Sequence, residues 1–195
     1  MNRIYWIPCM FLLFLLPACL TVETILTRII FDKNTELIRI IILYENISSA
    51  ESDIQDVEAD LKYLIDQVED EAYLLERLEQ GFYIKKRRLF VQEQKIMAEE
   101  ELITRDPEAI MKEFNLLQDS LYWKMPLNKR DSDFEVVSHN GELFKTETEN
   151  NLRWPKDIQE ITWKSQLRQL PESFEKNRKK IVEELDNYLK KTKKK

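Results

Sequence analysis

The sequence predicts an all-α, elongated fold. It would consist of a long central helix of coiled-coil type, shorter C-terminal helices and one small β-hairpin insertion. The 195 residues include only two glycines, Gly81 and Gly141. Glu, Lys and Leu are abundant, as is typical of long helices. From Ile54 onward, apolar residues recur with the seven-residue period of a coiled coil.

The chain opens with an apolar segment, residues 1–22, in which no charge interrupts Ile4–Leu20. Such a segment is typical of a secretory signal or a membrane anchor. It is at the short limit of a membrane span. Pro8 and Pro17 weaken a regular spanning helix, which favours the signal. A leader without a role, from an alternative first exon or a misjudged start, is the other alternative.

Residues 23–50 carry a second apolar patch that charged residues interrupt. The patch is too broken to span a bilayer, so we expect an amphipathic helical lead-in, buried or interfacial. Asn46-Ile47-Ser48 is a glycosylation acceptor only if this region enters a secretory lumen.

Residues 51–105 are predicted to form the long coiled-coil-like helix. A 3.5-residue period places one apolar stripe along a helix and favours supercoiling against a partner. Gly81 weakens the helix and is expected to mark a bend or a break. The candidate packing seam consists of Ile54, Val57, Leu61, Leu64, Val68, Leu75, Leu78 and Phe82.

The charges are unevenly distributed. The net charge of -6 argues against nucleic-acid binding, which needs a basic surface. Residues 51–80 are strongly acidic and the C-terminal end is basic, which suits pairing with a protein partner or between chains. The basic cluster Lys85–Arg88 is either a contact for an acidic partner or a solvated helix face.

A second helix is expected over residues 106–125. Asp106 provides an N-cap side chain and Pro107 suits the first helical position. The apolar residues Ile110, Phe114, Leu117 and Leu121 would form one face of this helix.

Residues 126–152 are expected to be a loop with a possible hairpin. Asn140-Gly141 between two apolar runs is the strongest short hairpin signal in the chain. The only histidine, His139, lies beside this turn and is expected to be structural or solvated.

A helical pair is predicted over residues 153–190. Trp154-Pro155 would open it, and Pro171 would restart or kink it. The second member is a basic amphipathic helix, with a basic tail at residues 191–195.

The residue types exclude several kinds of enzyme. Two glycines rule out a P-loop, a dinucleotide-binding turn and a nucleophile elbow. One histidine rules out a multi-histidine metal site. No nucleophile–base pair stands out. We therefore predict no catalytic, cofactor-binding or metal-binding residue, no cofactor, and no enzyme.

One pattern is similar to a known family. Leu152-x-Trp154-Pro155-x-x-Ile158 is followed by Phe174-Glu175-x-x-Arg178 and by Glu183-Glu184-Leu185. This resembles the helical tail-to-linker region of axonemal dynein heavy chains, over about residues 52–190. The resemblance implies a non-catalytic tail or linker piece in a microtubule-based motor assembly, without the ATP-binding machinery.

Two functional hypotheses follow. The first is a non-enzymatic helical interaction segment in the cytoplasm, cytoskeleton or cilium, which would bind protein partners, or itself, through helix packing. The second is a membrane-anchored or secreted coiled-coil protein that uses Ile4–Leu20. Under the second, the membrane is a possible partner.

Overall fold

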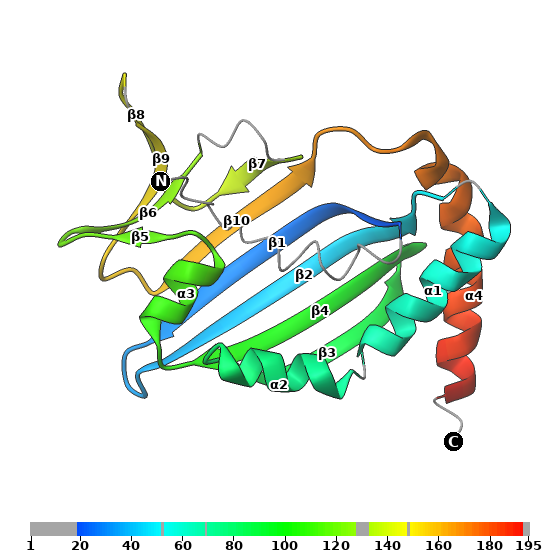
Figure 1. Ribbon diagram of the computed structural model, residues 1–195. Coiled ribbons are helices and arrows are strands. Elements are labelled where there is room, and N and C mark those ends of the chain that lie inside the picture. The colour runs from blue at the N-terminus through cyan, green and yellow to red at the C-terminus, as the bar shows by residue number, and fades with distance from the viewer. Residues whose placement is uncertain (1–18, 52, 69, 128–132, 148, 193–195) are drawn as a thin grey trace, which may run out of the picture.

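The computed structural model describes residues 19–51, 53–68, 70–127, 133–147 and 149–192. Within these ranges the chain forms ten β-strands, arranged in two antiparallel sheets, and four α-helices (Figure 1). The prediction of an all-α, elongated coiled-coil fold is therefore wrong. The signal or anchor prediction falls almost entirely on residues outside these ranges, as does most of the basic tail.

The first two strands, β1 (Leu20–Asp32) and β2 (Leu37–Ser49), form a long antiparallel hairpin. The amphipathic helical lead-in predicted for residues 23–50 is thus wrong. Strand β1 is rich in Ile and Thr and β2 is rich in Ile, and the branched side chains of these residues favour extended backbone. Ile29 and Ile40 lie opposite each other and are completely buried, so this hairpin forms the centre of the core.

Two short helices and a hairpin replace the single helix predicted for residues 51–105. Helix α1 spans Ile54–Val68 and helix α2 spans Glu71–Glu79. Asp70 is the N-cap of α2, and its carboxylate accepts a hydrogen bond from the amide of Ala72. A new helix start at this position divides the predicted coiled-coil stripe between two separate helices.

Gly81 ends α2 in the left-handed conformation, with φ at 87°. The amide of Gly81 donates to the carbonyl of Leu78, and the amide of Phe82 donates to the carbonyl of Arg77. These two hydrogen bonds define a Schellman helix end, which glycine favours. The break expected at Gly81 is confirmed, and the chain continues as a strand.

Strands β3 (Tyr83–Gln92) and β4 (Lys95–Thr104) form the next hairpin. Its turn residues, Glu93 and Gln94, both have positive φ, as in type I′ hairpin turns. The basic cluster Lys85–Arg88 lies opposite the acidic run of β4 and forms ion pairs with it. The acidic partner of this cluster is therefore the neighbouring strand.

Helix α3 spans Pro107–Glu113, and Asp106 caps it by accepting a hydrogen bond from the amide of Glu108. The predicted helix start is confirmed. The predicted end at residue 125 is wrong, because the chain turns at Asn115, which has positive φ. Strands β5 (Leu117–Gln118) and β6 (Tyr122–Pro126) follow.

The hairpin predicted at Asn140-Gly141 is also wrong. Strand β7 (Phe134–His139) pairs with β10 (Glu160–Leu167), whereas β8 (Glu142–Lys145) pairs with β9 (Asn150–Pro155). The chain therefore crosses from one sheet to the other at Asn140-Gly141.

The side chain of Asn140 fastens this crossing to both sheets. Its Nδ2 donates to the carbonyl of Glu160, and its Oδ1 accepts from the amide of Thr162, both in the larger sheet. The same Oδ1 accepts from Nε1 of Trp154 in the smaller sheet, across 2.8 Å.

The helical pair predicted for residues 153–190 is half correct. Its first half forms strands β9 and β10, and Trp154 and Trp163 in these strands are buried core residues. Its second half is helix α4 (Glu172–Thr192), which follows Pro171 as expected.

The strands are arranged in a large and a small sheet. The large sheet has the order β3-β4-β2-β1-β10-β7 and the small sheet has the order β5-β6-β9-β8. Helices α1, α2 and α3 lie on one face of the large sheet, and α4 stands at its end beside α1 (Figure 1). Aromatic contacts join the sheets, with ring centroids of Phe31 and Trp123 5.4 Å apart and those of Trp154 and Trp163 6.4 Å apart.

Candidate functional site

An apolar cavity of about 130 Å³ lies between α1 and the large sheet. Ile25, Tyr44 and Ile47 line it from β1 and β2, and Tyr63 and Leu64 line it from α1. Tyr44 and Ile47 are buried, so the sheet side of the cavity is fixed by core packing.

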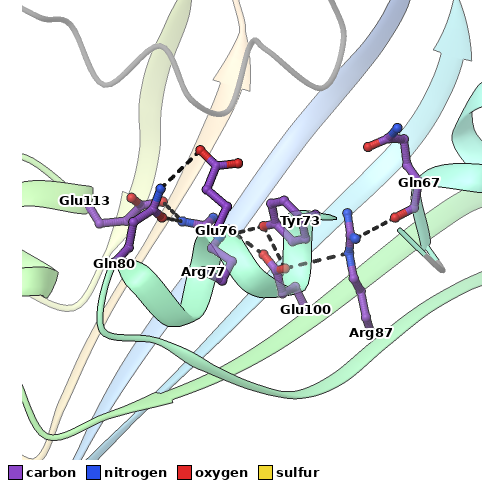
Figure 2. Close-up of polar contacts among 8 residues, drawn as sticks. All are labelled: Gln67, Tyr73, Glu76, Arg77, Gln80, Arg87, Glu100 and Glu113. Carbon is purple, nitrogen blue, oxygen red and sulfur yellow. Dashed lines mark hydrogen bonds and ion pairs between the residues drawn. The ribbon is translucent and has the colours of Figure 1, made fainter. Parts of the chain in front are cut away.

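A polar wall bounds the cavity on the side of α2. It is formed by Tyr73 of α2, Arg87 of β3 and Glu100 of β4. Arg77 and Glu113 lie beside Tyr73 and Glu100, on the side away from Arg87 (Figure 2). We call Tyr73, Arg77, Arg87, Glu100 and Glu113 the charge cluster.

Arg77 is the centre of the charge cluster, and only 1% of its surface is exposed. Its Nε donates to the Tyr73 hydroxyl across 2.7 Å, and that hydroxyl donates to Oε1 of Glu100 across 2.8 Å. Its Nη1 lies 2.8 Å from Oε1 of Glu113, at the end of α3. The guanidinium is therefore satisfied by partners from three parts of the chain.

Arg87 contributes the second positive charge. Its guanidinium lies 4.0 Å from the centroid of the Tyr73 ring, and its Nε lies 3.7 Å from Oε1 of Glu100. It also donates a hydrogen bond to the carbonyl of Gln67 near the end of α1. Arg87 thus connects both helices to the sheet.

Burial changes the proton affinities within the charge cluster. Burial raises the pKa of Glu100, although Arg77 and Arg87 act in the opposite direction. Burial and the nearby charge of Glu100 raise the pKa of Tyr73, so the phenol stays protonated. Burial would lower the pKa of Arg77, but Tyr73, Glu113 and Glu100 together raise it.

The charge cluster has two guanidinium groups and two carboxylates, so it is electrically balanced when all four are ionised. A balanced, hydrogen-bonded group of this kind fixes the positions of its members. We infer that it holds α2 against the sheet and keeps the polar wall of the cavity in place.

The predicted packing seam is not one surface. Val57, Leu61 and Phe82 are buried in the core. Leu64 and Val68 line the cavity. Leu75 and Leu78 are exposed to 62% and 52%. The side chain of Ile54 lies outside the described part of the structure.

Sequence reasoning missed the two residues of α2 that do face the sheet, Tyr73 and Arg77. They are four positions apart and therefore lie on one side of the helix. One signal in the sequence indicated the sheet side of this site. Residues 85–88 are basic and residues 99–101 are acidic, and the two runs lie at similar distances before and after the turn at residues 93 and 94, as two paired strands of a hairpin would.

Two other predicted features have structural positions. Asn46 of the glycosylation acceptor is 1% exposed, and its Nδ2 donates to Glu23. A folded chain therefore does not present this asparagine. His139 is exposed, and its Nδ1 lies 3.0 Å from the carbonyl oxygen of Gly141.

Comparisons with known proteins identify no relative of this chain. No family model matches the chain, and neither does any curated protein or solved structure. Among the residues that the structure describes, no helix is long and apolar enough to cross a membrane. The same residues contain no group of three or more His, Cys, Asp or Glu side chains arranged to hold a metal ion.

Proposed function

We propose that this protein is a non-enzymatic binding protein that takes a small apolar molecule in the cavity between α1 and the large sheet. The observation that carries the proposal is the apolar lining of the cavity, of which Ile25, Ile47 and Leu64 are part. Burying apolar surface of a ligand there is favourable by roughly 25 cal/mol per Å².

The size of the cavity defines the class of ligand. A volume of about 130 Å³ is close to that of engineered apolar cavities that bind benzene, at roughly 150 Å³. A single aromatic ring or a short hydrocarbon chain fits this space. The charge cluster supplies a rigid polar boundary, which limits the orientations available to a ligand.

Benzene binding to the full chain, measured by isothermal titration calorimetry, tests the proposal. Ala98 lines the cavity, so Ala98→Leu should fill it and weaken benzene binding about tenfold or more. Ala59→Leu, on the exposed side of α1, is the matched control and should bind like the original protein. Equal binding by the two variants would place benzene elsewhere and refute the proposal.

The hypotheses on location stay predictions. Fractionation of a tagged chain separates them, since carbonate-resistant membrane association would support the anchor and a soluble, unglycosylated chain would contradict it. The resemblance to dynein tails also stays a prediction. A reading frame that continues into an ATPase ring would support it. The helix that the resemblance implies for Leu152–Ile158 is absent, because strand β9 and the residues after it occupy this segment.

A further inference from the structure

Helix α2 buries its polar side and exposes its apolar side. Of its nine residues, only Tyr73 and Arg77 are buried. Leu74, Leu75 and Leu78 are exposed to 38%, 62% and 52%. This arrangement is the reverse of an ordinary amphipathic surface helix, which packs its apolar stripe on the core.

The three leucines form one continuous strip, which we call the leucine strip. Leu74 and Leu78 are four positions apart, and Leu75 and Leu78 are three apart, so their side chains are neighbours on the helix surface. Single exposed leucines are ordinary, but contiguous apolar patches on soluble proteins mark interaction sites.

The leucine strip is not needed to attach α2 to the rest of the protein. Contacts of Tyr73 and Arg77 with Glu100 hold the helix on the sheet, and the ion pair of Arg77 with Glu113 joins it to α3. The Schellman end at Gly81 fixes its C-terminus. Within the part of the chain that the structure describes, these leucines are exposed and are therefore available for contact with a partner.

The charges beside the leucine strip indicate the chemistry of its partner. Glu71, Glu76 and Glu79 are exposed on the same helix, and Asp70 caps it. The only base in α2 is Arg77, which points inward and is paired. A surface of leucine flanked by carboxylates is complementary to an apolar surface flanked by Lys or Arg.

We propose that α2 is a docking helix for a basic amphipathic helix of a partner protein. The leucine strip would pack against the apolar stripe of the partner, and Glu71 and Glu79, which are each four positions from Leu75, would face its basic flanks. Contact between two copies of α2 would bring like charges together, and an anionic membrane would repel the same carboxylates.

A pair of synthetic peptides tests this proposal directly on the full chain. One is an 18-residue helix with a leucine stripe and lysine flanks, and the other has the same stripe with glutamate flanks. Fluorescence anisotropy should show saturable binding of the lysine peptide and no binding of the glutamate peptide. Leu75→Ser with Leu78→Ser should weaken the lysine peptide tenfold or more.

The control variant is Leu117→Ser with Leu121→Ser, since these leucines are exposed to 56% and 66% outside α2. It should bind the lysine peptide normally. Equal weakening by both variants, or no effect of the α2 variant, would overturn the proposal. Two other results would also overturn it: a dimer seen by sedimentation, or adsorption to phosphatidylserine vesicles, if either is lost in the α2 variant and kept in the control variant. Circular dichroism confirms that each variant is folded.

Discussion

The Nε of Arg77 donates a 2.7 Å hydrogen bond to the hydroxyl of Tyr73, one helical turn earlier in α2. The same hydroxyl donates to Glu100 in β4, and Arg77 also pairs with Glu113 at the end of α3. A short helix is thus attached through buried polar groups. Such an attachment is strong only while every member has its partner.

Replacing Arg77 with Met should destabilise the protein by about 3–5 kcal/mol, because Glu100 and Glu113 would lose the cation between them. Urea unfolding measures the change. Arg88→Met is the control, since Arg88 is half exposed and its ion pair with Glu99 contributes about 1 kcal/mol or less. Similar losses in both variants would contradict the central position assigned to Arg77.

The two glycines should respond differently to alanine. Gly81→Ala should cost about 1–2 kcal/mol, because φ is positive there but the nearest side-chain atom is 3.6 Å from a new Cβ. In Gly141→Ala the new Cβ would lie 2.6 Å from the buried indole of Trp154. We expect a shift in tryptophan fluorescence for Gly141→Ala alone, and an unchanged spectrum there would count against this packing.

The turn of the β3–β4 hairpin offers a stabilising substitution. Glu93 and Gln94 have φ values of 51° and 58°, a conformation that costs most L-residues energy. Asn-Gly is the preferred pair for a turn with two positive φ values. Glu93→Asn with Gln94→Gly should therefore raise the free energy of unfolding by about 1 kcal/mol, measured in urea. A lower stability would show that the turn has another geometry.

Glu99 should contribute to acid sensitivity. Burial would raise its pKa, but hydrogen bonds from Lys86 and Arg88 lower it below the ordinary 4.5. Its stabilising effect is then present above pH 4.5 and is lost as the pH falls through the lowered pKa. Glu99→Gln should flatten the stability curve below pH 4.5 relative to the curve of the original protein. Matching curves would exclude this contribution.

Cys19 should react slowly despite its exposure. A hydrogen bond with Glu51, together with partial desolvation and nearby carboxylates, raises its pKa from 9.0 to about 11. The reactive thiolate is therefore scarce at pH 8. In a Cys9→Ser background, iodoacetamide should alkylate Cys19 roughly tenfold or more slowly than free cysteine. Glu51→Gln should speed the reaction, and an unchanged rate would remove Glu51 as the cause.

The sequence predicted local features more successfully than pairing between distant segments. The cap at Asp106, the break at Gly81 and the helix after Pro171 depend on a few adjacent residues and were identified correctly. The β1–β2 hairpin was missed because Leu26, Ile30, Ile41 and Leu43 add apolar residues on the second face of the strands. The alternation that identifies a strand is hidden when both faces carry apolar residues.

The cavity and the charge cluster could not be predicted from one helical pattern. Tyr73 is close in sequence to leucines at heptad spacing. The heptad period predicts that Leu75 and Leu78 are buried, but the structure exposes both. The polar partners Glu100 and Glu113 come from a strand and another helix. Only the tertiary fold brings these charges beside Arg77, so burial of Arg77 follows from long-range contacts.

The position of β1 has a consequence for how the protein is made. This strand lies inside the large sheet between β2 and β10. The ion pair between Arg28 and Glu160 joins residues 132 positions apart. At roughly 5–20 residues per second, a ribosome needs on the order of ten seconds to supply the second neighbour. During that time one edge of an isoleucine-rich strand stays unpaired. The nascent chain is therefore more prone to aggregation than the folded protein and has the greater need of chaperones.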